Sequence, residues 1–380
     1  MNFDYNEEQK MLKESMQRWV QDNYSFDQRR VILDSEEGLS RAHWSTFAEL
    51  GWLSIPFSEE YGGYGGSIID TAAMMEEFGK ALLLEPMAAN LVMFGGALQK
   101  AGGANAQSII PQIIDGSLMG ALATYEPQAR YDLSNIKTAA TADGDSITLT
   151  GSKALAAGGA HADHFIVSAR ESGDTTDETG ISLFLVARDA EGLTVTPQNL
   201  MDGQKVADLT LDGVSVSADQ RIGEAGAGYA ILDATMQDAS IALSAEAVGI
   251  MQTLNKETIE YTKTRKQFGV PISVFQALQH RMVDCFMAYE QSKSLLCGAL
   301  CELTDGTTPR EDARQTVLAL RTLIAKYGKQ VGDEAIQMHG GMGITDEMSV
   351  GHYVKRLLMI NLQFGNGDFF QKQFNQLAYG

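Results

Sequence analysis

The spacing of apolar residues is the feature that most constrains this sequence, because it changes twice along the 380-residue chain. In the first third, apolar side chains recur every three to four positions, as at Leu12, Met16 and Trp19, which predicts amphipathic helices. From about 117 to 222 they alternate or run in short pieces bounded by glycine, aspartate and serine, which predicts β-strands. After Gly228 the helical spacing returns and persists. The chain is therefore expected to fold in three segments.

These segments predict an α+β fold with three domains. They are an N-terminal helical domain (1–116), a middle antiparallel β domain (117–222) and a C-terminal four-helix bundle (223–380). The length suits two or three domains that share hydrophobic cores. Short connections between the long helices favour antiparallel neighbours in a bundle. The four bundle helices are expected at about 229–264, 273–303, 309–338 and 347–376.

Composition limits the classes of partner. The formal net charge of −20 argues against nucleic acid and anionic membranes, which both require a basic surface. The first residues, MNFDYNEEQK, lack the features of a secretory signal, and no apolar run is long enough to span a membrane, so a cytoplasmic location is expected. Neither the six histidines nor the cysteines show metal-ligand spacing, so no metal site is predicted. The cysteines are Cys285, Cys297 and Cys301.

Three motifs occur in order along the chain. The first lies at the start of the β segment, and the other two lie in the C-terminal helical segment. Thr124–Pro127 reads T-Y-E-P and is followed by Asp132. Thr264–Gly269 reads T-R-K-Q-F-G and is followed by Phe275–Gln276, and Gln337–Gly343 reads Q-M-H-G-G-M-G. Together they resemble the signatures of the acyl-CoA dehydrogenase family, and the resemblance covers essentially the whole chain. The family's fold has the same three parts in the same order.

The resemblance implies the cofactor FAD, held between the β domain of one subunit and the bundle of its dimer partner. Arg265 would grip the pyrophosphate bidentately, although alone it would be read as a solvated helix end. Gln276 and Gln337 would hydrogen-bond flavin or adenosine groups, and Gly340 and Gly341 would let the backbone approach the nucleotide. In the family these residues contact the FAD of the partner subunit. Two aromatic residues complete this group, Phe268 and Phe275.

The family's catalytic base is a glutamate in a Y-E-G-T motif, which removes the α-proton of the acyl-CoA. The matching stretch here reads F-G-N-G and has Gly365 at the position of the base. Some members carry the base on the first bundle helix, before an arginine, where this chain has Ala239 and then Ser240. Asp368 and Glu246 are the alternative carboxylates within reach of these positions. A surface role for Asp368 and an interfacial or solvated role for Glu246 are the simpler interpretations.

The positions at which family members contact the flavin of their own subunit are also altered in this chain. A W-x-T motif normally covers the flavin ring, and Leu155 and Ala157 stand in its place. The threonine position of the T-E-P motif holds Tyr125, although Thr124 is adjacent. Tyr131 replaces a small residue and would crowd the approach of phosphate and substrate.

The residues that contact the partner's flavin are thus kept, while those for the chain's own flavin and the base are lost. This predicts the non-catalytic partner of a heteromeric acyl-CoA dehydrogenase. Residues 128–133 and 263–279 most resemble the small subunit of pimeloyl-CoA-type dehydrogenases. Paired enzymes of this kind act on dicarboxyl-CoA or steroid-side-chain CoA thioesters. The implied partners are an acyl-CoA thioester, a homologous catalytic subunit and an electron-transfer flavoprotein or similar acceptor, with oligomer contacts through the C-terminal bundle.

Two other interpretations remain open. One is a self-sufficient homo-oligomeric flavoenzyme with an atypical base or oxidase chemistry. The other is a non-enzymatic scaffold that has lost FAD. Retention of Arg265 and Gln276 argues against the scaffold, because a scaffold does not require a pyrophosphate-binding group.

Overall fold

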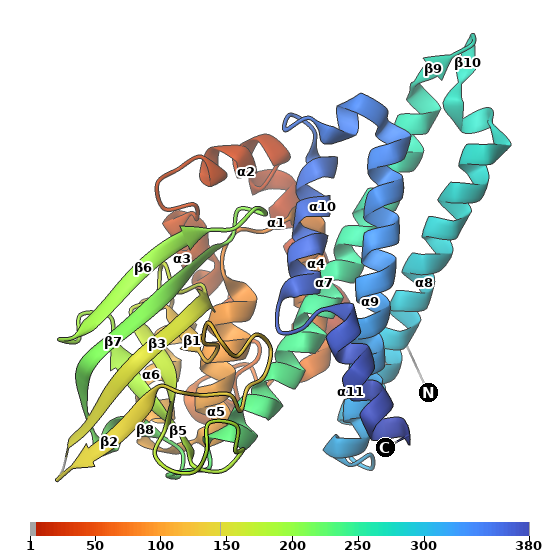
Figure 1. Ribbon diagram of the computed structural model, residues 1–380. Coiled ribbons are helices and arrows are strands. Elements are labelled where there is room, and N and C mark those ends of the chain that lie inside the picture. The colour runs from red at the N-terminus through yellow and green to blue at the C-terminus, as the bar shows by residue number, and fades with distance from the viewer. Residues whose placement is uncertain (1–4, 145, 380) are drawn as a thin grey trace. The chain divides into compact units, whose positions relative to one another are not determined.

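The computed structural model describes residues 5–144 and 146–379. It confirms the predicted fold class, with N-terminal helices, a middle β-sheet and C-terminal helices (Figure 1). The chain divides into two compact units. The first unit draws on Met1–Val31, Ile68–Leu83 and Ser240–Gly380, and the second on Ile32–Ser67 and Leu84–Ala239. The domain boundaries expected from the sequence stay predictions.

The N-terminal helices begin with a sequence-encoded cap. Asn6 and Gln9 form a capping box, in which each side chain accepts the other residue's backbone N–H. A π-helical segment, η3 (Ala88–Gly95), lies among the later helices. The other helices of this part are α1 (Glu7–Asn23), α2 (Phe26–Leu33), α3 (Arg41–Glu49), η1 (Trp52–Ser54), η2 (Glu59–Tyr61), α4 (Ile68–Ala81), α5 (Gly96–Ala101) and α6 (Gly103–Ile114).

The middle segment forms one sheet of eight strands in the order β6-β7-β3-β2-β4-β5-β8, with β1 also paired to β4. The predicted antiparallel sheet is wrong at two places, because β1 runs parallel to β4 and β2 touches β4 in parallel at one residue pair. About 40 residues separate β1 from β4, enough for the crossover that a parallel pair requires. The strands are β1 (Gly120–Ala123), β2 (Ala139–Asp143), β3 (Ser146–Ala157), β4 (His164–Arg170), β5 (Ile181–Ala187), β6 (Leu193–Asn199), β7 (Lys205–Ser217) and β8 (Arg221–Ile222).

The C-terminal helices confirm three of the four expected elements and correct the fourth. The helix expected at 347–376 is two helices, α10 (Ser349–Leu362) and α11 (Gly367–Tyr379). Between them Phe364 has φ +66° and Gly365 has φ +150°, and neither value can continue a right-handed helix. The three confirmed helices are α7 (Gly228–Thr264), α8 (Gln276–Thr304) and α9 (Arg310–His339).

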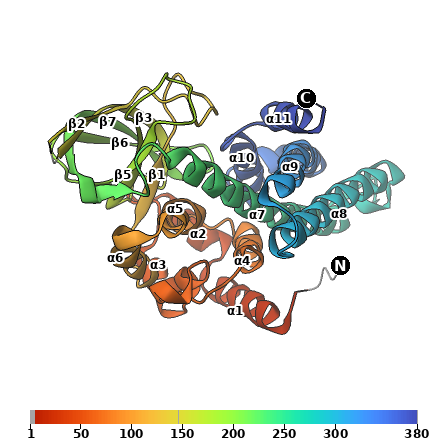
Figure 2. The ribbon, with the colours of Figure 1, turned by 90° about the horizontal axis from the view of Figure 1, so that it is seen from below.

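In the first unit, α9 packs against α8, α10 and α11 (Figure 2). A two-stranded hairpin, β9 (Lys266–Gln267) with β10 (Val270–Pro271), joins α7 to α8. None of the helices in the described part of the chain is long and apolar enough to cross a membrane.

Candidate functional site

The hairpin between α7 and α8 displays an arginine and an aromatic side chain to solvent. Arg265 is exposed, and within the described ranges its guanidinium has no carboxylate or hydrogen-bond acceptor in reach. Phe268 and Gly269 form the two-residue turn, with φ +53° and +82°. Such a turn favours asparagine and glycine, so a phenylalanine that is 91% exposed here costs stability without contributing to the core. Strain of this kind is typical of a binding surface.

The aromatic side chains and the amide of the same motif lie at the start of α8. Phe275 is the N-cap residue, and its ring meets that of Phe268 edge-to-face with centroids 6.1 Å apart. Gln276 opens the helix, and its side chain is exposed. The motif therefore presents the Arg265 guanidinium, the Gln276 amide and an aromatic pair.

The second bundle motif ends α9 beside the end of α7. Tyr261 stacks on His339 with ring centroids 4.3 Å apart, and its hydroxyl donates to the His339 carbonyl at 3.3 Å. The Tyr261 carbonyl also accepts the Arg265 backbone N–H, so one helical turn separates the two motifs. A Cβ atom at Gly340 or Gly341 would have no heavy atom of the described structure within 4 Å. The backbone there is open to a ligand.

The structure thus brings the predicted partner-side residues together at one end of the helices. Exposed amides, open glycine backbone and an exposed guanidinium are groups that bind phosphate esters. The residues of this group are Arg265, Phe268, Phe275, Gln276, Gln337, Gly340 and Gly341.

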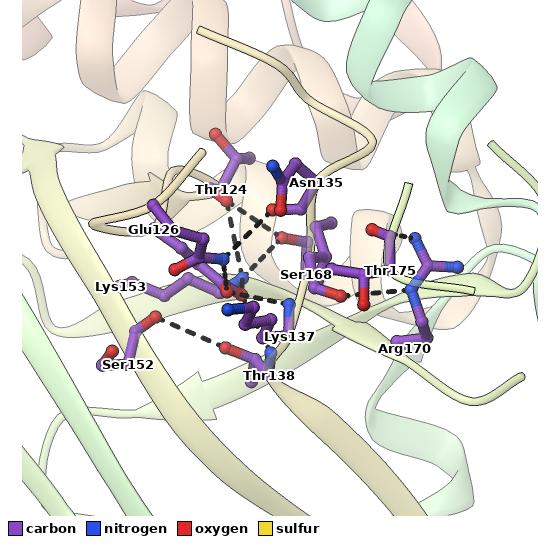
Figure 3. A network of polar contacts seen from close by, with 12 residues as sticks. Thr124, Glu126, Asn135, Lys137, Thr138, Ser152, Lys153, Ser168, Arg170 and Thr175 are labelled. Atoms are coloured by element: carbon purple, nitrogen blue, oxygen red, sulfur yellow. Dashed lines mark hydrogen bonds and ion pairs between the residues drawn. The ribbon is translucent and has the colours of Figure 1, made fainter. Parts of the chain in front are cut away.

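The T-Y-E-P motif is fixed by a buried ion pair that the sequence did not reveal (Figure 3). The Lys153 ammonium lies 2.7 Å from a Glu126 carboxylate oxygen and donates to Ser168 at 3.0 Å. The other Glu126 oxygen accepts the Lys137 backbone N–H at 2.8 Å. Burial would raise the pKa of Glu126, but the Lys153 ammonium and hydrogen bonds from Thr138 and Gln128 lower it to about 2. Burial lowers the pKa of Lys153 to about 8.

Arg170 joins the same segment to the polar insert 171–179. Its guanidinium donates to the carbonyls of Ser134 at 2.8 Å and Ile136 at 3.1 Å. It also donates to the carbonyl of Thr175 at 3.1 Å (Figure 3). All these acceptors are backbone atoms, so Arg170 has a structural role: it connects the two segments through hydrogen bonds. These hydrogen bonds attach the segment that follows the T-Y-E-P motif to β4.

The predicted residues for the chain's own flavin belong to the second unit. Thr124 is buried, Tyr125 and Tyr131 are half-buried, and Leu155 is 54% exposed. Ala157 is half-buried at the end of β3. The tryptophan and threonine that would cover a flavin ring are absent from these positions.

The position at which the resemblance predicts the base, Gly365, is closed by aromatic rings. A Cβ atom at Gly365 would lie 2.5 Å from Phe369 Cδ1 and 2.7 Å from Phe370 Cζ. Ala239 and Ser240 are both buried. The sequence has no carboxylate at either of the family's two positions.

The two alternative carboxylates differ in their surroundings. Asp368 is exposed in the first turn of α11. Glu246 is buried, and Arg356 donates to both of its oxygens, from Nε at 2.5 Å and from Nη2 at 2.7 Å. Both carboxylate oxygens are thus occupied by the guanidinium. The geometry favours a structural role for Glu246, and neither residue is supported as the base.

Comparisons with known proteins cover the whole chain. Residues 6–117, 121–214 and 226–372 match the family descriptions "Acyl-CoA dehydrogenase, N-terminal domain", "middle domain" and "C-terminal domain". The probable acyl-CoA dehydrogenase YngJ of Bacillus subtilis is 29% identical over 97% of both chains. The acyl-CoA dehydrogenase FadE12 of Mycobacterium tuberculosis is 30% identical over 92% of this chain and 90% of its own.

Solved structures agree with these relatives. PigA with FAD and proline has a TM-score of 0.92 and 28% identity, over 99% of both chains. A variant of the Tcur3481–Tcur3483 steroid ACAD has a TM-score of 0.87 and 27% identity, over 98% of this chain and 97% of that one.

Proposed function

Because the chain belongs to the acyl-CoA dehydrogenase family of flavin-dependent oxidoreductases, we propose that it is the base-lacking subunit of a heteromeric acyl-CoA dehydrogenase. The observation that carries this proposal is the contrast between two sites. The exposed surface around Arg265 keeps the residues that the resemblance predicts to contact the partner's flavin. In contrast, the position of Gly365 is closed by Phe369 and Phe370. A single-chain enzyme requires both sites.

The partner-side residues fit the pyrophosphate and nucleotide of FAD. Arg265 presents an exposed guanidinium, and Gly340 and Gly341 leave the backbone open, so the phosphates and the adenosine can come close. Gln276 and Gln337 are exposed amides beside them. When bound, FAD supplies the hydride acceptor for α,β-dehydrogenation. This chain's residues would hold the nucleotide end, and a glutamate of the catalytic subunit would remove the α-proton.

An apolar surface on the first unit fits the contact with that subunit. Exposed apolar side chains of this size and number are typical of a protein interface. They follow the outer face of α8 and the hairpin before it, so the contact runs through the C-terminal helices. The residues are Phe268, Val274, Phe275, Val283, Phe286 and Met287.

The substrate is an acyl thioester. The similarity to the Tcur3481–Tcur3483 steroid ACAD supports a CoA thioester as the substrate. Because that enzyme is named by two proteins, the similarity also supports a paired enzyme. The similarity to an L-prolyl-[peptidyl-carrier protein] dehydrogenase of Serratia favours a second candidate, a self-sufficient flavoenzyme acting on a prolyl thioester. In both cases we place the protein in the cytoplasm, with an electron-transfer flavoprotein or similar acceptor.

The test is to purify the chain alone and with a homologous subunit that retains Y-E-G-T. Both preparations are assayed with acyl-CoA thioesters, a prolyl thioester and an artificial electron acceptor. A missing general base slows the reaction by about 10²–10⁴-fold. We expect turnover only in the mixed preparation. Brisk turnover by the chain alone would establish the self-sufficient alternative.

A further inference from the structure

His352 on α10 is a buried histidine that the proposed function does not use. It is 3% exposed, and its two ring nitrogens contact different parts of the first unit. Nδ1 lies 3.3 Å from Nη1 of Arg29 on α2, while Nε2 lies 3.1 Å from the backbone carbonyl oxygen of Asp346. The Phe26 ring meets the imidazole edge-to-face, with centroids 5.0 Å apart. His352 therefore connects α2 to the loop that precedes α10.

The partners of the imidazole decide which of its nitrogens carries the proton. A guanidinium can only donate hydrogen bonds, so Nδ1 must accept from Arg29 and carries no proton. The proton is then on Nε2, from which it is donated to the Asp346 carbonyl. The neutral imidazole satisfies both contacts, whereas a second proton on Nδ1 would point at the guanidinium. Arg29 is itself buried and its Nε donates to the Leu82 carbonyl at 2.7 Å, so the guanidinium is held in place.

The surroundings of His352 make its protonation unfavourable. Burial lowers its pKa below the ordinary 6.5, and Arg29 and Lys355 act in the same direction, while the carbonyl and carboxylate of Asp346 oppose them. The Asp346 carboxylate lies 3.3 Å from Nε2 and also accepts from Lys355 at 3.0 Å. The hydrogen bond from Lys355 lowers the pKa of Asp346, so this carboxylate is ionised throughout the range in which a histidine titrates. Within this contact, mild acid therefore changes the charge of His352 alone.

The segment that His352 holds continues from the exposed Gly340 and Gly341. Both glycines belong to a short 3-10 helix, η6 (Gly340–Ile344), and Asp346 follows it two residues later. α10 also packs against η6. Release of Asp346 from α10 would therefore loosen the backbone that the resemblance assigns to the nucleotide.

We propose that His352 is a positioning residue that makes FAD retention depend on pH. The neutral imidazole holds Asp346 against α10 and so keeps Gly340 and Gly341 in place for the FAD of the catalytic subunit, and protonation of Nδ1 releases this contact. The inference rests on the proposed function, since it concerns the surface that this chain offers to that FAD. His352 acts through the backbone of Asp346 and does not itself touch the cofactor.

The first test measures amide hydrogen exchange of residues 340–348 in the full chain from about pH 7.5 to about pH 5.5, corrected for intrinsic exchange rates. Because the folded pKa of His352 lies below the ordinary 6.5, the contact is complete above pH 6.5 and weakens as the pH falls below it. The opening equilibrium should rise by up to about 10-fold over this range. His352→Gln places an amide N–H near the position of Nε2 and cannot be protonated, so it should abolish the dependence. The matched control His161→Gln changes a half-buried histidine of the second unit and should leave the dependence as in the wild type.

The second test follows FAD retention by the complex with the catalytic homologue over the same pH range. Retention should fall together with the exchange protection in the wild type and stay constant in His352→Gln.

The outcomes separate this inference from the proposed function. Wild-type protection that does not change with pH would overturn the inference, even if the variant did not fold. An equal fall in His352→Gln would overturn it as well, because it would assign the dependence to another group such as Glu257 on α7, whose pKa burial raises. Constant FAD retention while the wild-type protection falls would also refute it. The proposed function fails on a different result, namely turnover by the wild-type chain alone.

Discussion

Replacing Gly365 by glutamate restores the residue type that the family uses as its base, yet the structure predicts loss of stability and no recovery of activity. At φ +150° a non-glycine residue is strained, which costs about 1–3 kcal/mol. The new Cβ atom would lie 2.5 Å from Phe369 and 2.7 Å from Phe370, an overpacking that costs about 1–3 kcal/mol more. The sum, about 2–6 kcal/mol, is a large part of the 5–15 kcal/mol that stabilises a typical domain.

Urea unfolding of Gly365→Glu, Gly365→Ala and Gly298→Ala measures these contributions separately. Gly365→Ala shares the strain and the Cβ contact but adds no carboxylate, so it should lose most of the same stability. Gly298 lies in α8, and no heavy atom of the described structure is within 4 Å of its Cβ position, so alanine there should be neutral or stabilise by about 0.5–1 kcal/mol. A Gly365→Glu protein with wild-type stability that dehydrogenates acyl-CoA on its own would refute the reasoning.

Other variants test the remaining contacts. Arg265→Ala should weaken FAD retention by the complex by about 1.5–3 kcal/mol, measured by flavin titration; unchanged affinity would remove Arg265 from the site. Glu246→Gln should cost about 3–5 kcal/mol in urea unfolding, because it leaves the buried Arg356 charge without its carboxylate; a loss of turnover without loss of stability would instead indicate a base. Glu126 has a folded pKa of about 2, below the ordinary 4.5, so its contribution to stability is present above pH 4.5 and is lost as the pH falls towards 2. In Glu126→Gln the free energy of unfolding should therefore depend less on pH below pH 4.5 than it does in the wild type. The same pH dependence in both proteins would contradict this.

The fold could be predicted because its main signal is local. Helical spacing, its switch to strand spacing and the order of three motifs are visible without any knowledge of contacts. The prediction of one helix at 347–376 is wrong at the break after Leu362, because the apolar spacing continues across Gly365 and does not record the change of backbone direction there. The parallel pairing of β1 with β4 joins segments about 40 residues apart, and no local pattern records it.

The candidate site was predicted less completely. The exposed partner-side residues lie in two short motifs and could be named from sequence. The ion pair of Glu126 and Lys153 in the second unit could not be named from the sequence, because the two residues are 27 positions apart and meet only when β3 joins the sheet. Likewise Glu246 was a candidate base until the fold placed Arg356, 110 residues away, on its carboxylate. A buried charge is interpretable only with its partner.

The number of FAD molecules per chain decides whether this protein is an auxiliary subunit. It can be measured by flavin absorbance together with native mass spectrometry, on the chain alone and on its complex with the catalytic homologue. We predict little FAD on the lone chain and fewer flavins than chains in the complex. A homo-oligomer of this chain that carries one FAD per chain and turns over an acyl thioester would contradict it.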